Sequence, residues 1–249
     1  MAVRRFNGST AYVRLNVGAL SAATHGTYAA IFRVVDNTDA RTLMAFLSSG
    51  NAFLWCPFMV NTDDRMLYHG DSDRFTAAAI PQAVWLLMVV RKATGTATPR
   101  FSYYNFNTTT WTHGDATGTT ANGTAPTSGF IQTATAGTAG TESFEGDIAV
   151  TAGWSNAVHW SADTTGDSQI EAAGLETSLG NWVDETPDGL WPYNQESVAT
   201  DVTDITGGGA DQAATLDTTV VTGDDPPGFL FSLGPAPSLW FTQAALQPR

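Results

Sequence analysis

The stretch FEGDIAVTAGWSNAVHW, residues 144–160, constrains the fold more than any other part of the sequence. Its apolar and polar residues alternate with a period of two at the start, which is typical of a β-strand. The alternation predicts a buried face with Phe144, Ile148 and Val150. Glu145 and Asp147 lie on the opposite face. The stretch therefore predicts a core strand that carries two carboxylates on its outward side.

Similar runs recur along the first half of the chain, separated by the Gly, Asn, Asp and Thr clusters that are typical of turns. In the clearest of them, Val13, Leu15 and Val17 alternate with polar residues. The further runs are residues 27–35, 41–49, 51–60, 65–69, 83–91, 100–106 and 129–135. Many short strands rich in Val, Phe, Tyr and Trp favour an all-β fold, either a sandwich or a jelly roll.

One short helix is predicted after Asp167, which can cap the N-terminus of residues 168–182. Helical spacing would turn Ile170, Leu179 and Trp182 inward. Gly174 is unfavourable in the middle of such a helix.

At 249 residues the chain is expected to form one large domain, since all-β sandwiches often use this length for a single unit. The expected domain covers residues 1–215. Residues 216–249 form a C-terminal extension rich in Pro and Gly, which is unsuited to a central strand. Its aromatic residues must cover apolar surface, either on the same domain or on a neighbouring subunit. They are Phe229, Phe231, Trp240 and Phe241.

Charge is distributed unevenly along the chain. Residues 1–100 carry ten basic and six acidic residues, whereas residues 101–249 carry eighteen acidic residues and one basic residue, Arg249. The acidic part would repel a polyphosphate, so no nucleic-acid partner is expected. The two parts could attract each other within one chain or between subunits of a homo-oligomer.

The chain has one cysteine, Cys56, in an apolar run, and we expect it to be buried and unreactive. The first ten residues lack the apolar core of a signal peptide, and no apolar run is long enough for a membrane span. We therefore expect synthesis in the cytoplasm without ordinary secretion and no membrane partner. Arginine outnumbers lysine ten to one, which indicates a GC-rich coding genome.

No cofactor is expected from the sequence. The four histidines, His25, His69, His113 and His159, are dispersed without the spacing of metal ligands. The chain also lacks a nucleophile elbow, a phosphate-binding loop and a cysteine pair. The sequence argues less strongly against calcium than against metals bound by histidine or cysteine. Three acidic turns offer oxygen ligands, although none has the spacing of an EF-hand. These turns are residues 61–65, 69–73 and 201–204.

Three segments together resemble the laminin-G-like, concanavalin A-like jelly rolls. RRFNGSTAYVRL (residues 4–15) is similar to their opening strand, and AVWLLMVVRKATGTATPRFSYYN (83–105) to their central hairpin. FEGDIAVTAGWSNAVHWSADTTGDSQIEAA (144–173) is similar to their late strand and the helix after it. The resemblance covers residues 4 to 182. It implies a concanavalin A-like sandwich of two antiparallel sheets with one short helix.

One segment is out of order relative to that family. DGLWPYNQESVATDVTDITGGGADQAAT, residues 188–215, is similar to the segment that usually precedes the opening strand, but here it follows the helix. We expect a permuted edge segment; the alternative is the start of a lost second copy. Permutation is favoured because Leu190, Trp191 and Tyr193 need burial.

Some laminarinase-type glycoside hydrolases share this sandwich and carry Glu-x-Asp-x-(x)-Glu on one strand. Glu145 and Asp147 match the first two positions, but Ala149 or Val150 stands at the third. Glycoside hydrolysis needs two separate carboxyl groups that flank the bond, and the middle Asp does not replace the third. We therefore predict no enzyme, and a surface carboxylate pair that caps loop amides or meets arginines.

Glycan binding is a further possibility, because sugars stack on aromatic rings flanked by hydrogen-bonding groups. The candidates are Trp111 with His113, Trp154 with Asn156, and Trp160. The alternative is that these tryptophans fill the core.

A chain of this make-up resembles virion proteins of tailed bacteriophages of GC-rich, actinobacterial-type hosts. The resemblance rests on the WPYNQ segment, residues 191–195, followed by TGGGAD, residues 206–211. It implies a structural virion protein, a minor tail or tail-tip protein with other virion proteins as partners. Capsid decoration and a carbohydrate-binding module are the alternatives. Contact with host cell-wall polysaccharide would combine the virion and glycan predictions.

Overall fold

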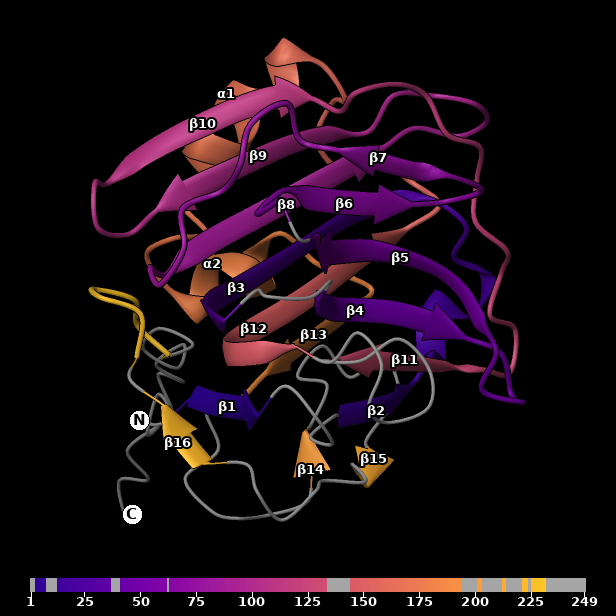
Figure 1. The fold of residues 1–249 in the computed structure, drawn as a ribbon, viewed down its shortest axis with the longest axis horizontal. Coiled ribbons are helices and arrows are strands. Elements are labelled where there is room, and N and C mark those ends of the chain that lie inside the picture. The colour runs from indigo at the N-terminus through magenta and orange to yellow at the C-terminus, as the bar shows by residue number, and fades with distance from the viewer. Residues whose placement is uncertain are drawn as a thin grey trace, which may run out of the picture.

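The computed structural model describes most of the chain, namely residues 3–7, 13–36, 41–61, 63–133, 144–193, 201–202, 212–213, 221–223 and 225–231. These residues form two antiparallel β-sheets that pack face to face, with short helices against the outer face of one sheet (Figure 1). The chain is thus a β-sandwich of the jelly-roll kind, as the strand pattern predicts.

The larger sheet contains eight strands: β1 (Val3–Asn7), β3 (Gly26–Asp36), β8 (Leu86–Lys92), β9 (Arg100–Asn105), β10 (Thr110–Asp115), β12 (Glu145–Ser155), β13 (Gly189–Pro192) and β16 (Val221–Gly223). Their order is β10-β9-β8-β3-β12-β1-β16, and β13 pairs with β12 beside β1. β12 is therefore the central strand of this sheet, with β3 along one side and both β1 and β13 along the other.

The smaller sheet contains β2 (Val13–Asn16), β4 (Arg41–Leu47), β5 (Phe53–Val60), β6 (Met66–His69), β7 (Asp73–Phe75) and β11 (Phe130–Thr133). Its order is β2-β11-β4-β5-β6-β7. A separate pair is formed by β14 (Asp201–Val202) and β15 (Gln212–Ala213). The sequence pattern missed β7 and β10, whose residues are too polar to alternate clearly.

The space between the sheets holds the main apolar core. An aromatic cluster lies at its centre, where the Phe46 ring stacks on Trp55 with centroids 4.3 Å apart and Tyr28 meets both rings edge-on. A second core lies between the outer face of the larger sheet and the helical region, and includes Trp160 and Trp182. Cys56 is fully buried on the outer side of the smaller sheet, as predicted.

β12 departs from simple alternation at a β-bulge. Phe144 and Ile148 are buried between the sheets as expected, but the register with β3 shifts between Ile148 and Val150. The bulge turns Val150 to the opposite face, where it joins Ala149 in the second core. The prediction that Val150 shares the face of Phe144 was therefore wrong.

The helical region contains α1 (Thr164–Ala173) and α2 (Leu179–Asp184). Asp163, and not Asp167, caps α1 by accepting a hydrogen bond from the Thr165 amide. Gly174 ends α1 in the left-handed conformation, with φ at 62°, where a glycine is favourable. A further 3-10 turn, η1 (Gly18–Ala22), follows β2. Among the described residues no helix is long and apolar enough to cross a membrane.

The inward residues of the helical region are as predicted, since Ile170, Leu179 and Trp182 are all buried. Residues 225–231 run against α2: the Leu179 amide donates to the Leu230 carbonyl over 2.8 Å. Phe229 and Phe231 pack in the second core, so this part of the C-terminal extension covers its own domain. Trp240 and Phe241 lie outside the described residues.

β13 lies in the segment predicted to be a permuted edge strand, and the permutation stays a prediction. It pairs with β12 from Val150 to Gly153, and Leu190, Trp191 and Tyr193 are at most 1% exposed. The boundaries at residues 188, 215 and 216 remain predictions.

Candidate functional site

The two carboxylates of β12 do not form an exposed pair. Asp147 is fully buried, which contradicts the prediction that both lie on the surface. Arg5 of β1 donates to it from both Nε and Nη2, over 2.8 and 3.1 Å. Arg33 of β3 donates to Oδ2 from Nε over 2.8 Å. Because the strand pairings align Asp147 with both arginines, the carboxylate is an ion-paired link across three strands.

This pairing has a direct chemical consequence. A nucleophile or general acid must have a free oxygen that faces the substrate. Both oxygens of Asp147 accept hydrogen bonds from guanidinium groups inside the sheet, so they are not offered to a sugar. Glu145 is half-buried at the start of the strand. Contact with arginines was one of the two roles predicted for the Glu145–Asp147 pair, and Asp147 has this role.

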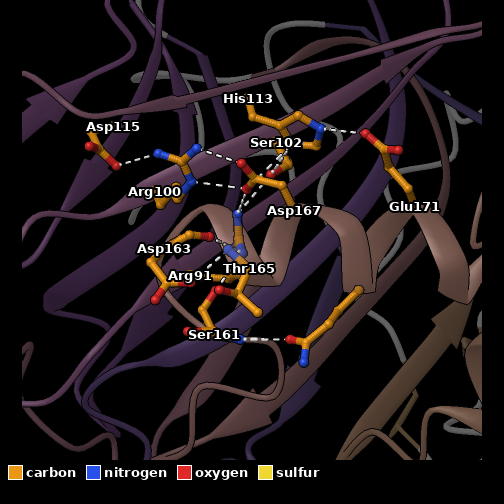
Figure 2. A network of polar contacts seen from close by, with 11 residues as sticks. Arg91, Arg100, Ser102, His113, Asp115, Ser161, Asp163, Thr165, Asp167 and Glu171 are labelled. Atoms are coloured by element: carbon orange, nitrogen blue, oxygen red, sulfur yellow. Dashed lines mark hydrogen bonds and ion pairs between the residues drawn. The ribbon is translucent and has the colours of Figure 1, made fainter.

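A second buried polar network fastens α1 to the larger sheet (Figure 2). Asp167 of α1 accepts a hydrogen bond from Arg91 of β8 over 2.5 Å and two from Arg100 of β9, over 2.9 and 2.5 Å. Burial alone would raise the pKa of Asp167, but the hydrogen bonds from Arg100 and Arg91 outweigh it and lower that pKa below the usual value. Arg100 also meets Asp115 of β10 over 2.7 Å.

Arg91 extends the network to the loop before α1. It is fully buried and donates to the Ser161 carbonyl and, over 3.3 Å, to the Asp163 carbonyl. A Cβ at Gly166 would lie 2.1 Å from Arg91 Nη1, so the guanidinium fits only because this residue is glycine. Sequence reasoning missed this network, although the arginine after the apolar run LLMVV was a visible signal.

His113 connects the network to the surface. Its Nδ1 lies 2.8 Å from Ser102 Oγ, and its Nε2 lies 2.9 Å from Glu171 Oε1 on α1 (Figure 2). The ring is thereby fixed in orientation, since both nitrogens have partners. Trp111, two residues earlier on the same strand, lies nearly parallel to it, with centroids 5.8 Å apart and an 8° interplanar angle.

Tyr104 of β9 completes a row of three rings on the helix-facing side of the sheet edge. Its centroid lies 5.4 Å from that of Trp111, directly across the strand pair. We call Tyr104, Trp111 and His113 the aromatic shelf. Tyr104 and Trp111 are half-buried, so part of their surface faces solvent.

Carboxylates border the aromatic shelf. Glu171 meets His113, and Glu176 lies close enough to Tyr104 to affect its titration. Burial, and then the charge of Glu176, raise the pKa of Tyr104. Burial also raises the pKa of Glu176, whose Oε2 is buried without a hydrogen-bond partner among the described residues. Aromatic rings beside carboxyl oxygens are the elements from which sugar-binding sites are built.

Trp154, Asn156 and Trp160 form a separate group at the far end of β12. Trp154 and Trp160 are only 4% and 5% exposed, and His159 stacks on Trp154 with centroids 5.0 Å apart. Asn156 is exposed, but its amide donates to the Ala22 carbonyl over 2.7 Å. Sugar stacking requires an open ring face, and the two tryptophans offer almost none. The predicted glycan residues therefore divide into two buried tryptophans with the exposed Asn156, and the two residues that lie on the shelf, Trp111 and His113.

A small cavity lies on the opposite face of the same two strands. It has a volume of about 130 Å³ and is lined by Thr76, Ala77, Ala78, Phe101, Tyr103, Thr112, His113, Gly114 and Asp115. We call it the β9–β10 cavity. The cavity lies at the edge of the sandwich. Among the described residues, β10 is the last strand at one edge of the larger sheet and β7 is the last strand at one edge of the smaller sheet.

Two of the acidic turns considered for calcium use an Asn or Asp side-chain oxygen in internal hydrogen bonds. Asn61 Oδ1 accepts from the Arg65 amide over 2.8 Å. Asp71 Oδ1 accepts from Thr120 and from the Ala121 amide, and these hydrogen bonds lower the pKa of Asp71 to about 2. Residues 203–204 lie outside the described residues. No group of three His, Cys, Asp or Glu suited to a metal occurs in the described part. The expectation that the protein holds no cofactor, calcium being the weaker exclusion, stays a prediction.

The remaining histidines have separate partners. His69 Nδ1 lies 2.5 Å from Asp73 and His159 Nε2 lies 2.7 Å from Glu185. His25 Nδ1 lies 3.0 Å from the Thr24 hydroxyl. The structure thus leaves the histidines dispersed, and each serves its own local contact.

No protein-family model and no curated protein sequence matches the chain. Among solved structures it is similar to a "putative carbohydrate binding protein" from Bacteroides ovatus, with 15% identity and a TM-score of 0.54. That match covers 93% of this chain, but the chain spans only 62% of the other protein. At this identity the likeness shows the fold alone.

Two further solved structures are less similar. The heptameric SAP-like pentraxin from Limulus polyphemus is 15% identical, with a TM-score of 0.46, over 70% of this chain and 83% of that chain. Tailspike protein 2 of an Escherichia coli O157:H7 bacteriophage is 13% identical, with a TM-score of 0.38, over 69% of this chain and 27% of that chain.

Proposed function

We propose that this protein is a non-enzymatic structural protein of a tailed bacteriophage virion. It is a minor tail or tail-tip protein, exposed on the particle, that contacts glycans of the host surface. The virion assignment rests on the sequence resemblance given above. The glycan contact rests on one structural observation: the aromatic shelf at the edge of the larger sheet.

The shelf is suited to a sugar because its rings are accessible and rigid. Sugars bind through C–H groups against ring faces and through hydroxyls that need hydrogen-bond partners. Trp111 supplies ring surface, and the exposed Glu171 supplies carboxyl oxygen beside His113. His113 is held between Ser102 and Glu171, so little conformational entropy is lost when a ligand binds.

The contacts of the two buried aspartates, Asp147 and Asp167, agree with a role without catalysis. Asp147 and Asp167 each form ion pairs with two arginines. Ion pairs of this kind hold strands and helix in one arrangement. A virion protein that carries mechanical load benefits from such rigidity.

The predicted homo-oligomer belongs to the same proposal. The excess of acidic residues after position 100 gives the two parts of the chain opposite charge, which can pair subunits or neighbouring virion proteins. Light scattering on the purified protein reads the oligomeric state directly. A monomer at virion-like local concentration would contradict this part.

The glycan contact is tested by titration of purified host cell-wall polysaccharide into wild type and Trp111→Ala. We expect the variant to bind about 5- to 30-fold more weakly, since an aromatic contact in a binding site contributes on the order of 1–2 kcal/mol. Trp160→Phe is the matched control, because Trp160 is buried away from the shelf. Equal binding by wild type and Trp111→Ala would refute the shelf as the contact site.

A further inference from the structure

β10 is the last strand at one edge of the larger sheet, and no strand in the described part of the chain pairs with its outer side (Figure 1). In an antiparallel sheet, every second residue of such a strand directs its backbone N–H and C=O away from the sheet. The backbone hydrogen bonds that flank β10 both run to the β9 side, from the Thr109 amide to the Asn105 carbonyl and from the Ala116 amide to the Pro99 carbonyl. The outer edge of β10 is therefore a row of backbone groups open to a further strand.

The neighbouring edge strand, β7 of the smaller sheet, is protected in ways that β10 is not. β7 is only three residues long, and the loop after β10 covers it. The Thr117 amide donates to the Phe75 carbonyl over 2.9 Å, and Arg74 donates to the Thr119 carbonyl.

Proteins keep exposed edge strands from pairing by shortness, covering loops, lysine, proline or bulges. β10 has six residues, TWTHGD, without lysine or proline, and its register with β9 is unbroken. Among the described residues β10 thus has none of these protections. Its Thr and Trp residues also suit a strand.

We propose that β10 pairs antiparallel with β10 of a second copy of this chain, so that the two larger sheets form one continuous sheet across a two-fold axis. A two-fold interface uses the same surface twice, and one open edge strand supplies both halves. This inference rests on the homo-oligomer proposed above and specifies its interface.

Strand geometry limits the register of this pair. Directly opposite residues share one face of a sheet, so a two-fold axis normal to the sheet must pass through a residue of β10. An axis through Thr112 puts Trp111 opposite His113 of the partner subunit, and aromatic pairs are favourable across two strands. An axis through His113 puts Trp111 opposite Asp115 of the partner subunit. An axis through Trp111 extends the pairing to Thr109, which lies outside the strand with φ at 55°. The axis through Thr112 is therefore the favoured one.

The charges at this edge allow two copies to approach. Asp115, the acidic residue of β10, is ion-paired with Arg100 and lies outside the paired residues 110–114. Glu171 borders the edge and contacts His113 of its own chain. Like charges therefore do not face each other across the axis.

This pairing also joins two aromatic shelves. Trp111 and His113 lie on the same face of β10 within one copy. Across the axis, Trp111 of each copy lies beside His113 of the partner subunit on that same face. A glycan that spans the axis contacts both shelves and gains the affinity that two linked sites give.

Sedimentation velocity over a range of protein concentrations tests the interface with a pair of charge variants. Wild type should sediment as a dimer. Thr112→Lys and Thr112→Glu each put two like charges opposite each other at the axis, and each should weaken dimerisation at least about tenfold. Thr112 is exposed, so both variants should fold, and circular dichroism checks this. An equimolar mixture of the two should restore the dimer, because Lys then faces Glu.

Thr96→Lys is the matched control. Thr96 is exposed in the loop between β8 and β9, away from the β10 edge, so this variant should dimerise like wild type. General repulsion between copies does not explain a monomeric Thr112→Lys, since the added lysine reduces the net charge of −13.

A dimer that persists in both Thr112 variants would overturn the β10 interface while the proposed homo-oligomer stands. Variants that dissociate but do not recombine in the mixture would also overturn it, as would dissociation of Thr96→Lys. If wild type is monomeric at every concentration, the proposed homo-oligomer fails first and the β10 interface falls with it.

Discussion

Replacing Asp167 by Asn should destabilise the protein strongly. The carboxylate lies between Arg91, which is fully buried, and Arg100, whose side chain is 9% exposed. Asn keeps the shape but removes the charge, so Arg91 loses its carboxylate partner inside the fold and Arg100 keeps only the exposed Asp115. Loss of one partner from a buried ion pair costs about 3–5 kcal/mol, a large share of the ~5–15 kcal/mol that stabilises a typical domain.

Urea unfolding at pH 7 measures this loss, with Asp115→Asn as the matched control. Asp115 contacts the same Arg100, but its side chain is 64% exposed, so its removal should cost less than about 1 kcal/mol. The low folded pKa of Asp167 adds a pH signature. The stability that the Asp167 carboxylate contributes is complete above its unfolded pKa and is lost as the pH falls through its folded pKa. Wild type and Asp167→Asn should therefore reach the same free energy of unfolding only in acid, below about pH 4. A cost within 1 kcal/mol of the control at neutral pH would refute the reasoning.

Three further predictions follow from the core. Asp147→Asn should lower the free energy of unfolding by about 2–4 kcal/mol, because its arginine partners are only partly exposed. Glu145→Gln is the control and should leave the free energy of unfolding nearly unchanged in the same urea titration. Gly123→Ala should cost about 1–3 kcal/mol in thermal melts, since its Cβ would lie 2.3 Å from the Trp55 ring, and an unchanged melting temperature would contradict that packing. Cys56 should react with a thiol reagent only after unfolding, and rapid labelling of the native protein would disprove its burial.

The strands were predictable where one face is apolar. Val13, Leu15 and Val17 alternate without interruption, and all three are buried. β12 was predicted as a strand, but period-two reasoning assumed that it was regular. The bulge after Ile148 depends on the register with β3, which a single strand does not reveal, and it moved Val150 to the other face.

The buried charges were the least predictable feature. Asp147 was assigned to the surface because the alternation of the strand places it opposite Phe144 and Ile148. Its partners, Arg5 and Arg33, are distant in sequence, so their pairing with it could not be seen there. Asp167 was taken as a helix cap because an Asp before a helical pattern usually caps it. The true cap, Asp163, lies four residues earlier, which frees Asp167 to meet the arginines of the sheet.

The candidate site was predictable only in part. Trp111 and His113 were identified as aromatic neighbours of a loop, and they do lie together on one face. Tyr104 joins them only through the β9–β10 pairing, and the cavity depends on Gly114, a residue without a side chain to attract attention. Both features need the three-dimensional arrangement of the strands.

Display on a phage particle, with contact to host glycans there, is the proposed role of this protein. Cryo-electron microscopy of purified particles, decorated with an antibody fragment raised against the protein, tests both parts of this proposal. The fragment should bind at the tail or tail tip, and free host cell-wall polysaccharide should compete with it when its epitope includes Trp111. Particles that lack the protein would contradict the account, and label confined to the capsid lattice would contradict the tail assignment.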